Sequence, residues 1–409
     1  MGSATLHNHD LSAAVTYRRV AESIDTDRVV SRATLLLQSM GRMITIIPMT
    51  LPLEHLTQHL ARLATHYDIG SEWPIKSLDH LTEAGAWTWI IPEQYGGRQL
   101  DPESQILAYE AVAAGCMASL LILTQRDGAC ELISSSPNEH LKQDLLPRLA
   151  AHELMTSVGI SQLTTSHQAG KPALIATPDG PNYRLRGFMP WVTSAEKCDF
   201  IVTGVALPES AEQILAVVPT DRPGIQIDPP MNLMALGGTL TSEVHCRDVV
   251  ITPDDILQGP AVRALERRSA VKALVVAAAG VGLAGTMARS IAKQAVKTSG
   301  PLRESAEEIL GRYEAVRDRL RKNAGRLNQP EAEVPAAELR IAVNDLLMRL
   351  AIATLTYAKG SGFIRQRDAQ RLVREAMFFL VWSTPEDIRA QTLAGFLDTP
   401  EPKSKSMKP

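Results

Sequence analysis

Residues 189–203 combine side chains that could form a binding surface for a flat aromatic group. The run reads Met-Pro-Trp-Val-Thr-Ser-Ala-Glu-Lys-Cys-Asp-Phe-Ile-Val-Thr and places Trp191 and Thr193 ahead of an apolar strand. Alternate residues of a strand point to the same side, so the indole and the hydroxyl would share one face. An indole can stack on a ring system, and a threonine hydroxyl can hydrogen-bond a ring heteroatom. The spacing therefore predicts a site for a planar heterocyclic cofactor.

The size and composition of the chain are those of a soluble globular protein with two or three domains. It has 409 residues, of which 45% are hydrophobic, 21% charged and 4% aromatic. The net charge of −3 gives no basic surface for nucleic acid. Four cysteines without metal-type spacing indicate reduced thiols in a cytoplasmic protein. No signal peptide is expected, and the longest apolar run, 273–288, is short for a membrane span.

Residues 49–154 are predicted to form a helical domain. Leucines between Leu53 and Leu63 recur with helical spacing, and Gly70 ends that segment. Asp101-Pro-Glu103 has the capping acid, proline and acidic residue typical of a helix N-terminus. We expect helices over 50–70, 77–84, 101–114, 118–133 and 138–151.

Residues 155–260 have the pattern of a β-domain. Turn signals at Asp179-Gly180 and Pro223-Gly224 separate short β-branched runs such as Phe200–Thr203 and Ile214–Val218. Short strands at this spacing predict a small antiparallel β-barrel or sandwich.

Residues 261–398 predict a C-terminal helical bundle, because long Ala- and Leu-rich segments alternate with short connections. Residues 1–48 are expected to be a partly disordered N-terminal extension and residues 399–409 a disordered tail. The predicted fold class is α+β multidomain, in the order all-α domain, β-domain, bundle. The expected bundle helices cover 263–298, 303–328, 333–358, 366–381 and 385–398.

Several segments between residues 55 and 395 resemble the acyl-CoA dehydrogenase family. Gly187–Phe200 resembles the Trp-Ile-Thr segment that packs against the isoalloxazine of FAD in that family. Gly360-Ser-Gly-Phe363 and Arg374-Glu375 keep the family's spacing between a Gly-rich turn and an Arg-Asp pair. Each match is short, but their order across three domains of the right type makes the resemblance specific. The other matching segments are Ile90–Gly97, Leu145–Glu153, Ser242–Pro253 and Gly280–Ala284.

The resemblance implies a fold, a cofactor and its contacts. A member of this family is expected to have the α–β–α domain order and to bind FAD. Trp191 and Thr193 fall on the flavin-ring contacts, and Ser161 falls on a threonine that contacts the flavin. Gly360 and Gly362 fall on the Gly-rich turn. The resemblance also implies an acyl-CoA substrate, an electron acceptor, and a homodimer or homotetramer.

The base of the family's reaction is missing from both positions where it occurs. The family removes a proton with a Glu, commonly in a Tyr-Glu-Gly-Thr run, while hydride leaves for the flavin. This run reads Trp382-Ser-Thr-Pro385, so the Glu position falls on Ser383, whose neutral hydroxyl is a poor base. Other members place the Glu where this chain has Lys272. Glu266 and Glu386 are the acids on these segments, and the catalytic base stays unassigned.

Segments that contact the charged parts of the ligands in the family also differ here. The Glu-Pro…Gly-Ser-Asp loop near the FAD and the acyl-CoA reads Gln162–Gln168. The Arg-x-x-Phe-Gly signature that reaches a neighbouring subunit's FAD pyrophosphate reads Val296–Gly300, where Lys297 offers only a point charge. An Arg of the acyl-CoA pocket maps near Ala273. The flavin-ring contacts are therefore kept better than the pyrophosphate and thioester contacts.

Three functions fit these features. We favour an acyl-CoA dehydrogenase-like FAD oxidoreductase that acts on a CH–CH bond of an acyl thioester with the Glu base replaced. The first alternative is a flavin-dependent monooxygenase of the same fold, which needs no such Glu and receives reduced flavin from a reductase. The second is a non-catalytic member that keeps the architecture alone.

Each predicted site residue also has a purely structural interpretation. Trp191 could be a half-buried core residue and Thr193 an ordinary strand residue. The two glycines of the Gly-rich turn could be a helix C-cap. His55 and His59 have the spacing of a metal-binding helix without the His-Glu-x-x-His context, so no metal site is expected among the ten histidines.

Overall fold

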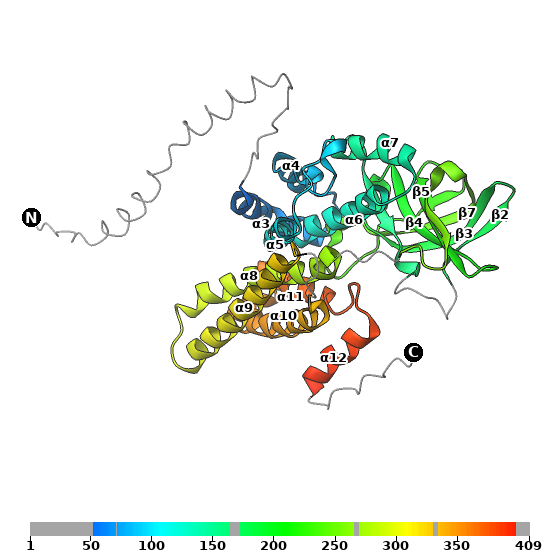
Figure 1. The fold of residues 1–409 in the computed structure, drawn as a ribbon. Coiled ribbons are helices and arrows are strands. Elements are labelled where there is room, and N and C mark those ends of the chain that lie inside the picture. Colours follow the sequence, from blue (N-terminus) through cyan, green and yellow to red (C-terminus); the bar gives the residue numbers. More distant parts are fainter. Residues whose placement is uncertain (1–51, 71, 164–171, 266–269, 330–333, 398–409) are drawn as a thin grey trace, which may run out of the picture. The chain divides into compact units, whose positions relative to one another are not determined.

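The computed structural model describes residues 52–70, 72–163, 172–265, 270–329 and 334–397 (Figure 1). The predictions for residues 1–48 and 399–409, for Glu266 and for most of the loop 162–168 lie outside these residues.

The first part of the described chain is helical, as predicted. Asp101 caps its helix, because its side chain accepts a hydrogen bond from the backbone N–H of Ser104 at 3.1 Å. The first helix begins after Pro52 and ends before Gly70. The helices are α3 (Leu53–Ile69), α4 (Ile75–Glu83), α5 (Pro102–Gly115), α6 (Met117–Ser134) and α7 (Glu139–Ala150).

The middle part is one sheet whose strands follow the order β6-β7-β3-β2-β4-β5-β8, with β1 paired to β4. It differs from the predicted antiparallel barrel or sandwich, because β1 and β2 both pair with β4 in parallel and make the sheet mixed. The local alternation that predicts a strand carries no information about its direction, so the mixed pairing was missed. The strands are β1 (Thr156–Gly159), β2 (Leu174–Asp179), β3 (Asn182–Val192), β4 (Phe200–Leu207), β5 (Glu212–Pro219), β6 (Ile225–Ile227), β7 (Ser242–Ile251) and β8 (Ile256–Ala261).

Two helices of the first part cover the sheet. Side chains of α6 and α7, such as Ile133 and Leu146, share one hydrophobic cluster with Phe200 and Val202 of β4 and Val217 of β5. Figure 1 shows both helices running beside the strands. The opposite side chains of the strands, such as Met189, Val192 and Val244, belong to the larger core.

The last part is helical and is centred on α8, which contacts α5, α9 and α10. The prediction that its first helix begins at 263 was wrong, because β8 extends to Ala261 and the helix begins at Ala270. Pro260 and the glycine before it permit an extended strand end there. The helices are α8 (Ala270–Ala295), α9 (Pro301–Arg326), α10 (Ala336–Ala358), α11 (Asp368–Phe378) and α12 (Glu386–Leu397).

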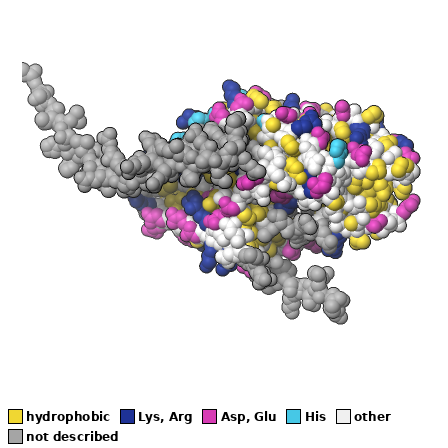
Figure 2. Space-filling model, turned by 45° about the horizontal axis from the view of Figure 1, so that its top comes forward, with side chains coloured by type: hydrophobic (Ala, Val, Ile, Leu, Met, Phe, Trp, Pro, Cys, Tyr) yellow, Lys and Arg dark blue, Asp and Glu magenta, His cyan; other side chains and the backbone are white. Residues whose placement is uncertain are grey.

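Two helical segments of the described chain, Val271–Ala295 and Ala336–Phe363, are long and apolar enough to cross a membrane by length and composition. The most apolar windows of these segments are 72% and 50% buried inside the protein. Burial by protein is what a bundle core requires of its helices, so the two segments are weak indicators of a membrane span. Figure 2 shows acidic and basic side chains intermingled on the visible face, in keeping with the small net charge.

Candidate functional site

Trp191 and Thr193 lie at the end of β3. The register with β7 shifts between Met189 and Val192, so Pro190 and Trp191 lie opposite a single residue of β7. Trp191 is 51% exposed, whereas Val192 is fully buried. Trp191 is therefore half exposed and is not part of the two hydrophobic clusters of the described residues.

The Thr193 hydroxyl has no hydrogen-bond partner within the described part of the chain. Its residue is 7% exposed and follows directly after the bulge. Its Oγ1 is not among the fully buried polar atoms, so water or a ligand can supply the missing hydrogen bond. The structure thus places a hydroxyl in need of a partner close in sequence to an open indole.

Ser161 belongs to a short 3-10 helix, η3 (Ser161–Leu163), that contacts β3. The neighbouring Gln162 fixes this helix to the sheet, since its Nε2 donates to the carbonyl oxygens of Gly159 at 2.7 Å and Gly204 at 2.8 Å. Nε2 also lies 3.1 Å from Oγ1 of Thr203. The structure therefore brings Ser161 to the strand that carries Trp191, and Gln162 has an anchoring role that the sequence did not reveal.

Gly360 and Gly362 lie in a second 3-10 helix, η7 (Lys359–Phe363), which contacts α10 and α11. A Cβ on Gly362 would lie 3.1 Å from side-chain atoms of Ala358 and Leu355, whereas a Cβ on Gly360 would meet open space. The two glycines thus belong to a turn between two helices of the last part of the chain. The C-cap of α10 is Lys359, so neither glycine is the C-cap residue.

Neither family position offers a free base. Ser383 is exposed in the turn after α11 and has a φ of 46°, a left-handed conformation that favours glycine. Lys272 is exposed on α8, and its Nζ is 2.9 Å from Oε2 of Glu131. An ammonium held by a carboxylate has no lone pair with which to take a proton. Glu386, the other acid near this turn, is the exposed first residue of α12.

A buried cation holds the turn that carries Ser383. Nη2 of Arg340, on α10, donates to the carbonyl oxygens of Phe379 at 2.7 Å and Trp382 at 3.0 Å. Burial lowers the pKa of Arg340 to about 10, and its Nε and Nη1 have no partner among the described residues. Arg340 therefore acts as a side-chain cap for the carbonyl oxygens at the C-terminal end of α11. The signal available in the sequence was a pair of polar residues, Arg340 and Asn344, on the buried stripe of α10.

Three possible metal ligands meet on the outer side of β6 and β7. His245 Nε2 lies 3.1 Å from a carboxylate oxygen of Asp228 and 3.1 Å from one of Glu243. One ligand atom from each residue lies within 4.8 Å of the others. The sequence singled out other histidines, because Asp228 joins this group only through strand pairing. A protonated Nε2 of His245 has one hydrogen to donate, which either carboxylate can accept.

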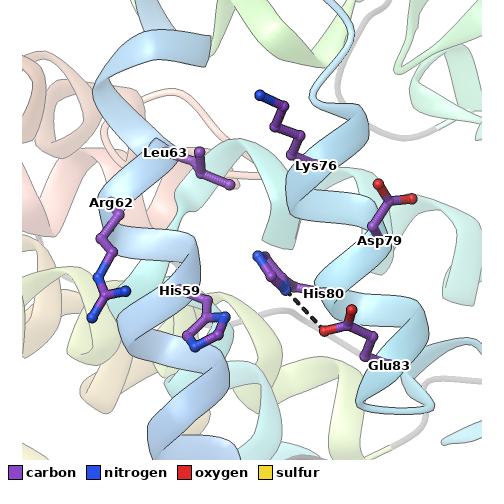
Figure 3. Close-up of a pocket in the computed structure, with 7 residues that line it drawn as sticks. All are labelled: His59, Arg62, Leu63, Lys76, Asp79, His80 and Glu83. Atoms are coloured by element: carbon purple, nitrogen blue, oxygen red, sulfur yellow. Dashed lines mark hydrogen bonds and ion pairs between the residues drawn. The ribbon is translucent and has the colours of Figure 1, made fainter.

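A groove of about 300 Å³ lies between α3 and α4 (Figure 3). The rings of His59 and His80 meet edge to face across it, with centroids 4.6 Å apart. His59 therefore interacts with the neighbouring helix, and none of the predicted cofactor contacts lines this groove. The lining residues are His59, Arg62, Leu63, Lys76, Asp79, His80 and Glu83.

Comparisons with known proteins agree with the predicted fold. Residues 54–153 match the family model described as acyl-CoA dehydrogenase, N-terminal domain. The chain is 26% identical over 364 residues to the Bacillus subtilis protein named probable acyl-CoA dehydrogenase YngJ, an alignment that covers 82% of this chain and 93% of that one.

Solved structures show the same fold at low sequence identity. Butyryl-CoA dehydrogenase from Megasphaera elsdenii superimposes with a TM-score of 0.74 at 18% identity and covers 84% of this chain and 96% of its own. Dibenzothiophene monooxygenase from Paenibacillus sp. A11-2 superimposes with a TM-score of 0.65 at 14% identity and covers 86% and 97%. Residues 54–153 therefore carry the N-terminal domain of the acyl-CoA dehydrogenase family, and the chain as a whole is similar to acyl-CoA dehydrogenases in sequence and in fold.

Proposed function

We propose that this protein is an FAD-dependent oxidoreductase of the acyl-CoA dehydrogenase type, acting on the CH–CH bond next to an acyl thioester. One observation carries the proposal: the half-exposed indole of Trp191 and the unpartnered hydroxyl of Thr193 at the end of β3. YngJ is named as an acyl-CoA dehydrogenase, and butyryl-CoA dehydrogenase has the same fold.

The residues at the end of β3 fit a flavin ring. Trp191 would stack against the ring, and the Thr193 hydroxyl would bond a ring heteroatom. Ser161 would contact the ring from η3, while Gly360 and Gly362 would contact the rest of the cofactor. Bound FAD would accept the hydride that leaves the β-carbon of the thioester.

Removal of the α-proton is the step in which this chain departs from its family. Ser383 is exposed at the position of the family base and has no carboxylate. We therefore expect the natural chain to dehydrogenate an acyl thioester slowly, and the rate to rise when a carboxylate is restored. Ser383→Glu restores the acid, and Ser383→Gln is the matched control of similar size without a base.

The visible spectrum of the purified protein, before and after addition of FAD, tests the cofactor. We expect flavin absorption with a shifted band shape when FAD is bound. Anaerobic addition of butyryl-CoA should bleach the flavin faster in Ser383→Glu than in Ser383→Gln. Equal bleaching rates in both variants would refute the assignment of Ser383 to the base position, and failure to bind FAD would refute the proposed function.

A flavin monooxygenase remains the second candidate because neither Ser383 nor Lys272 can act as the base, and dibenzothiophene monooxygenase has the same fold. The discriminating measurement is oxygen uptake with reduced flavin and a sulfur heterocycle such as dibenzothiophene. Oxygen-dependent product, with no bleaching by any acyl-CoA, would favour this candidate. Colourless protein that takes up no FAD would favour the non-catalytic alternative.

We also propose that the protein is a cytoplasmic homodimer or homotetramer. Large apolar side chains are exposed on the last helices, including Ile352 on α10 and Leu393 and Leu397 on α12. Exposed apolar groups of this kind are stabilised by a partner surface. Light scattering coupled to size exclusion measures the mass directly, and a monomer at micromolar concentration would contradict the assembly.

A further inference from the structure

A buried ion pair joins α3 to α11. Oδ2 of Asp68 lies 2.6 Å from Nη2 of Arg374, and the two side chains are 1% and 13% exposed. The partners are 306 residues apart in the sequence, so the pair fixes a tertiary contact between two parts of the chain. Burial of two charges is costly unless their remaining hydrogen-bonding atoms also find partners. The remaining atoms, Oδ1 of Asp68 and Nη1 of Arg374, both bind backbone groups of another segment.

Both members of the pair bind the same loop. Oδ1 of Asp68 accepts a hydrogen bond from the backbone N–H of Leu236 at 3.0 Å. Nη1 of Arg374 donates to the carbonyl oxygen of Met234 at 2.7 Å. These residues belong to the segment 234–239 between β6 and β7, called here the clamp loop.

The clamp loop is also held by close packing on α3. A Cβ on Gly237 would lie 2.8 Å from the carbonyl oxygen of Gly70, and one on Gly238 would lie 2.7 Å from that of Tyr67. Only glycine permits this approach of loop to helix. Leu236 has a φ of 65°, a left-handed conformation that the surrounding contacts must stabilise.

The clamp loop ends on the residue after Thr193. The carbonyl oxygen of Thr239 accepts hydrogen bonds from the backbone N–H of Ser194 at 2.9 Å and from its hydroxyl at 3.1 Å. Oγ1 of Thr239 donates to the carbonyl oxygen of Leu236 at 2.8 Å. A continuous series of short contacts therefore leads from Arg374 to Ser194.

We propose that Asp68 and Arg374 are positioning residues that set the orientation of Trp191 and Thr193 through the clamp loop. Without the pair, the loop would lose two hydrogen bonds to its backbone, and the end of β3 would lose its support at Ser194. The importance of this support for the cofactor rests on the proposed function. Its effect on Trp191 can be measured without any cofactor.

A second buried pair provides the matched control. Nη1 of Arg126 lies 2.9 Å from Oδ1 of Asp127, and these side chains are 1% and 2% exposed. The other hydrogen bonds of this pair go to Tyr109 and Leu149, within the first helical part of the chain. Asp127→Asn therefore perturbs an equally buried pair that does not bind the clamp loop.

The experiment measures acrylamide quenching of Trp191 as the difference between each variant and the same variant carrying Trp191→Phe. The variants are Asp68→Asn, Arg374→Met, their combination, Arg374→Lys and the control Asp127→Asn. We expect the first three to change the Trp191 quenching constant about twofold and to weaken FAD binding about tenfold, while Asp127→Asn lowers the melting temperature without either change.

The combined variant separates positioning from stability. Removal of both charges leaves no unpaired buried charge, so its melting temperature should exceed that of either single variant. Its Trp191 quenching should nevertheless stay altered, because Arg374→Met removes the donor to the carbonyl oxygen of Met234 and the ion pair no longer holds the loop between α3 and α11. Arg374→Lys, which keeps the charge but not the two-pronged contact, should fall between the natural protein and Arg374→Met.

Two outcomes would overturn the proposal. The first is equal Trp191 quenching changes in Asp68→Asn and Asp127→Asn. The second is a combined variant in which the melting temperature rises and Trp191 quenching also returns to the value of the natural protein. If the single variants fail to fold, Trp191 quenching in the combined variant and in Arg374→Lys tests the proposed positioning role. If the natural protein binds no FAD, the proposed function fails, and the quenching arm still tests the clamp.

Discussion

The end of β3 and the turn after α11 differ in how their polar groups find partners. At the end of β3 the indole of Trp191 is half exposed, and the hydroxyl of Thr193 has no partner among the described residues. In the turn, Arg340 binds two backbone carbonyl oxygens, and the exposed Ser383 occupies the position predicted for the family base. The polar groups of the turn are thus occupied by contacts within the protein, whereas those at the end of β3 are open to a ligand.

The largest expected effect comes from the support of the turn. Arg340→Ala should lower the free energy of unfolding by about 3 kcal/mol, because the carbonyl oxygens of Phe379 and Trp382 lose their donor and a cavity remains. Urea denaturation measures the loss. Arg349→Ala, on the exposed side of the same helix, should cost less than about 1 kcal/mol. Equal costs for the two variants would show that Arg340 does not hold the turn.

The next effect concerns the end of β3. Trp191→Ala should weaken FAD binding about tenfold through loss of ring stacking, with little change in melting temperature because the indole is half exposed. Flavin fluorescence titration measures the affinity. Ile75→Ala removes an apolar side chain of similar exposure on α4 and should leave the affinity unchanged. A stable Trp191→Ala variant with natural FAD affinity would remove the end of β3 from the cofactor site.

The smallest effect sharpens the comparison within the turn. Ser383→Gly should raise the free energy of unfolding by about 1 kcal/mol, because glycine adopts a positive φ without the steric cost of a Cβ. Thermal unfolding at constant pH reports the change. Ser383→Ala keeps the Cβ and should give no gain, so the same gain in both variants would contradict the assigned conformation.

The order of helices, sheet and helices was predictable because periodicity and caps are local signals. The stripe of leucines from Leu53 to Leu63 and the cap at Asp101 identified their helices. Trp191 was predictable as an exposed aromatic group only in combination with its motif. The parallel pairing of β1 and β2 with β4 was not predictable, since register and direction depend on contacts between distant segments.

The supports of the candidate site were missed for the same reason. Gln162 was noted only as a departure from a motif, and its bonds to Gly159 and Gly204 appear only when the strands are paired. Asp68 carries no signal in its own helix that it meets Arg374 or Leu236. The cofactor contacts, Ser161, Trp191, Thr193, Gly360 and Gly362, remain predictions that the proposed experiments address.

All four cysteines, at 116, 130, 198 and 246, are free and buried. Burial raises the pKa of the Cys130 and Cys246 thiols to about 12, which keeps them protonated and unreactive at neutral pH. A cysteine introduced at an exposed position, such as Ser383→Cys, would then be the preferred target of a maleimide dye or a nitroxide spin label. A single label could therefore be attached to the turn for spectroscopy without first replacing the four natural cysteines.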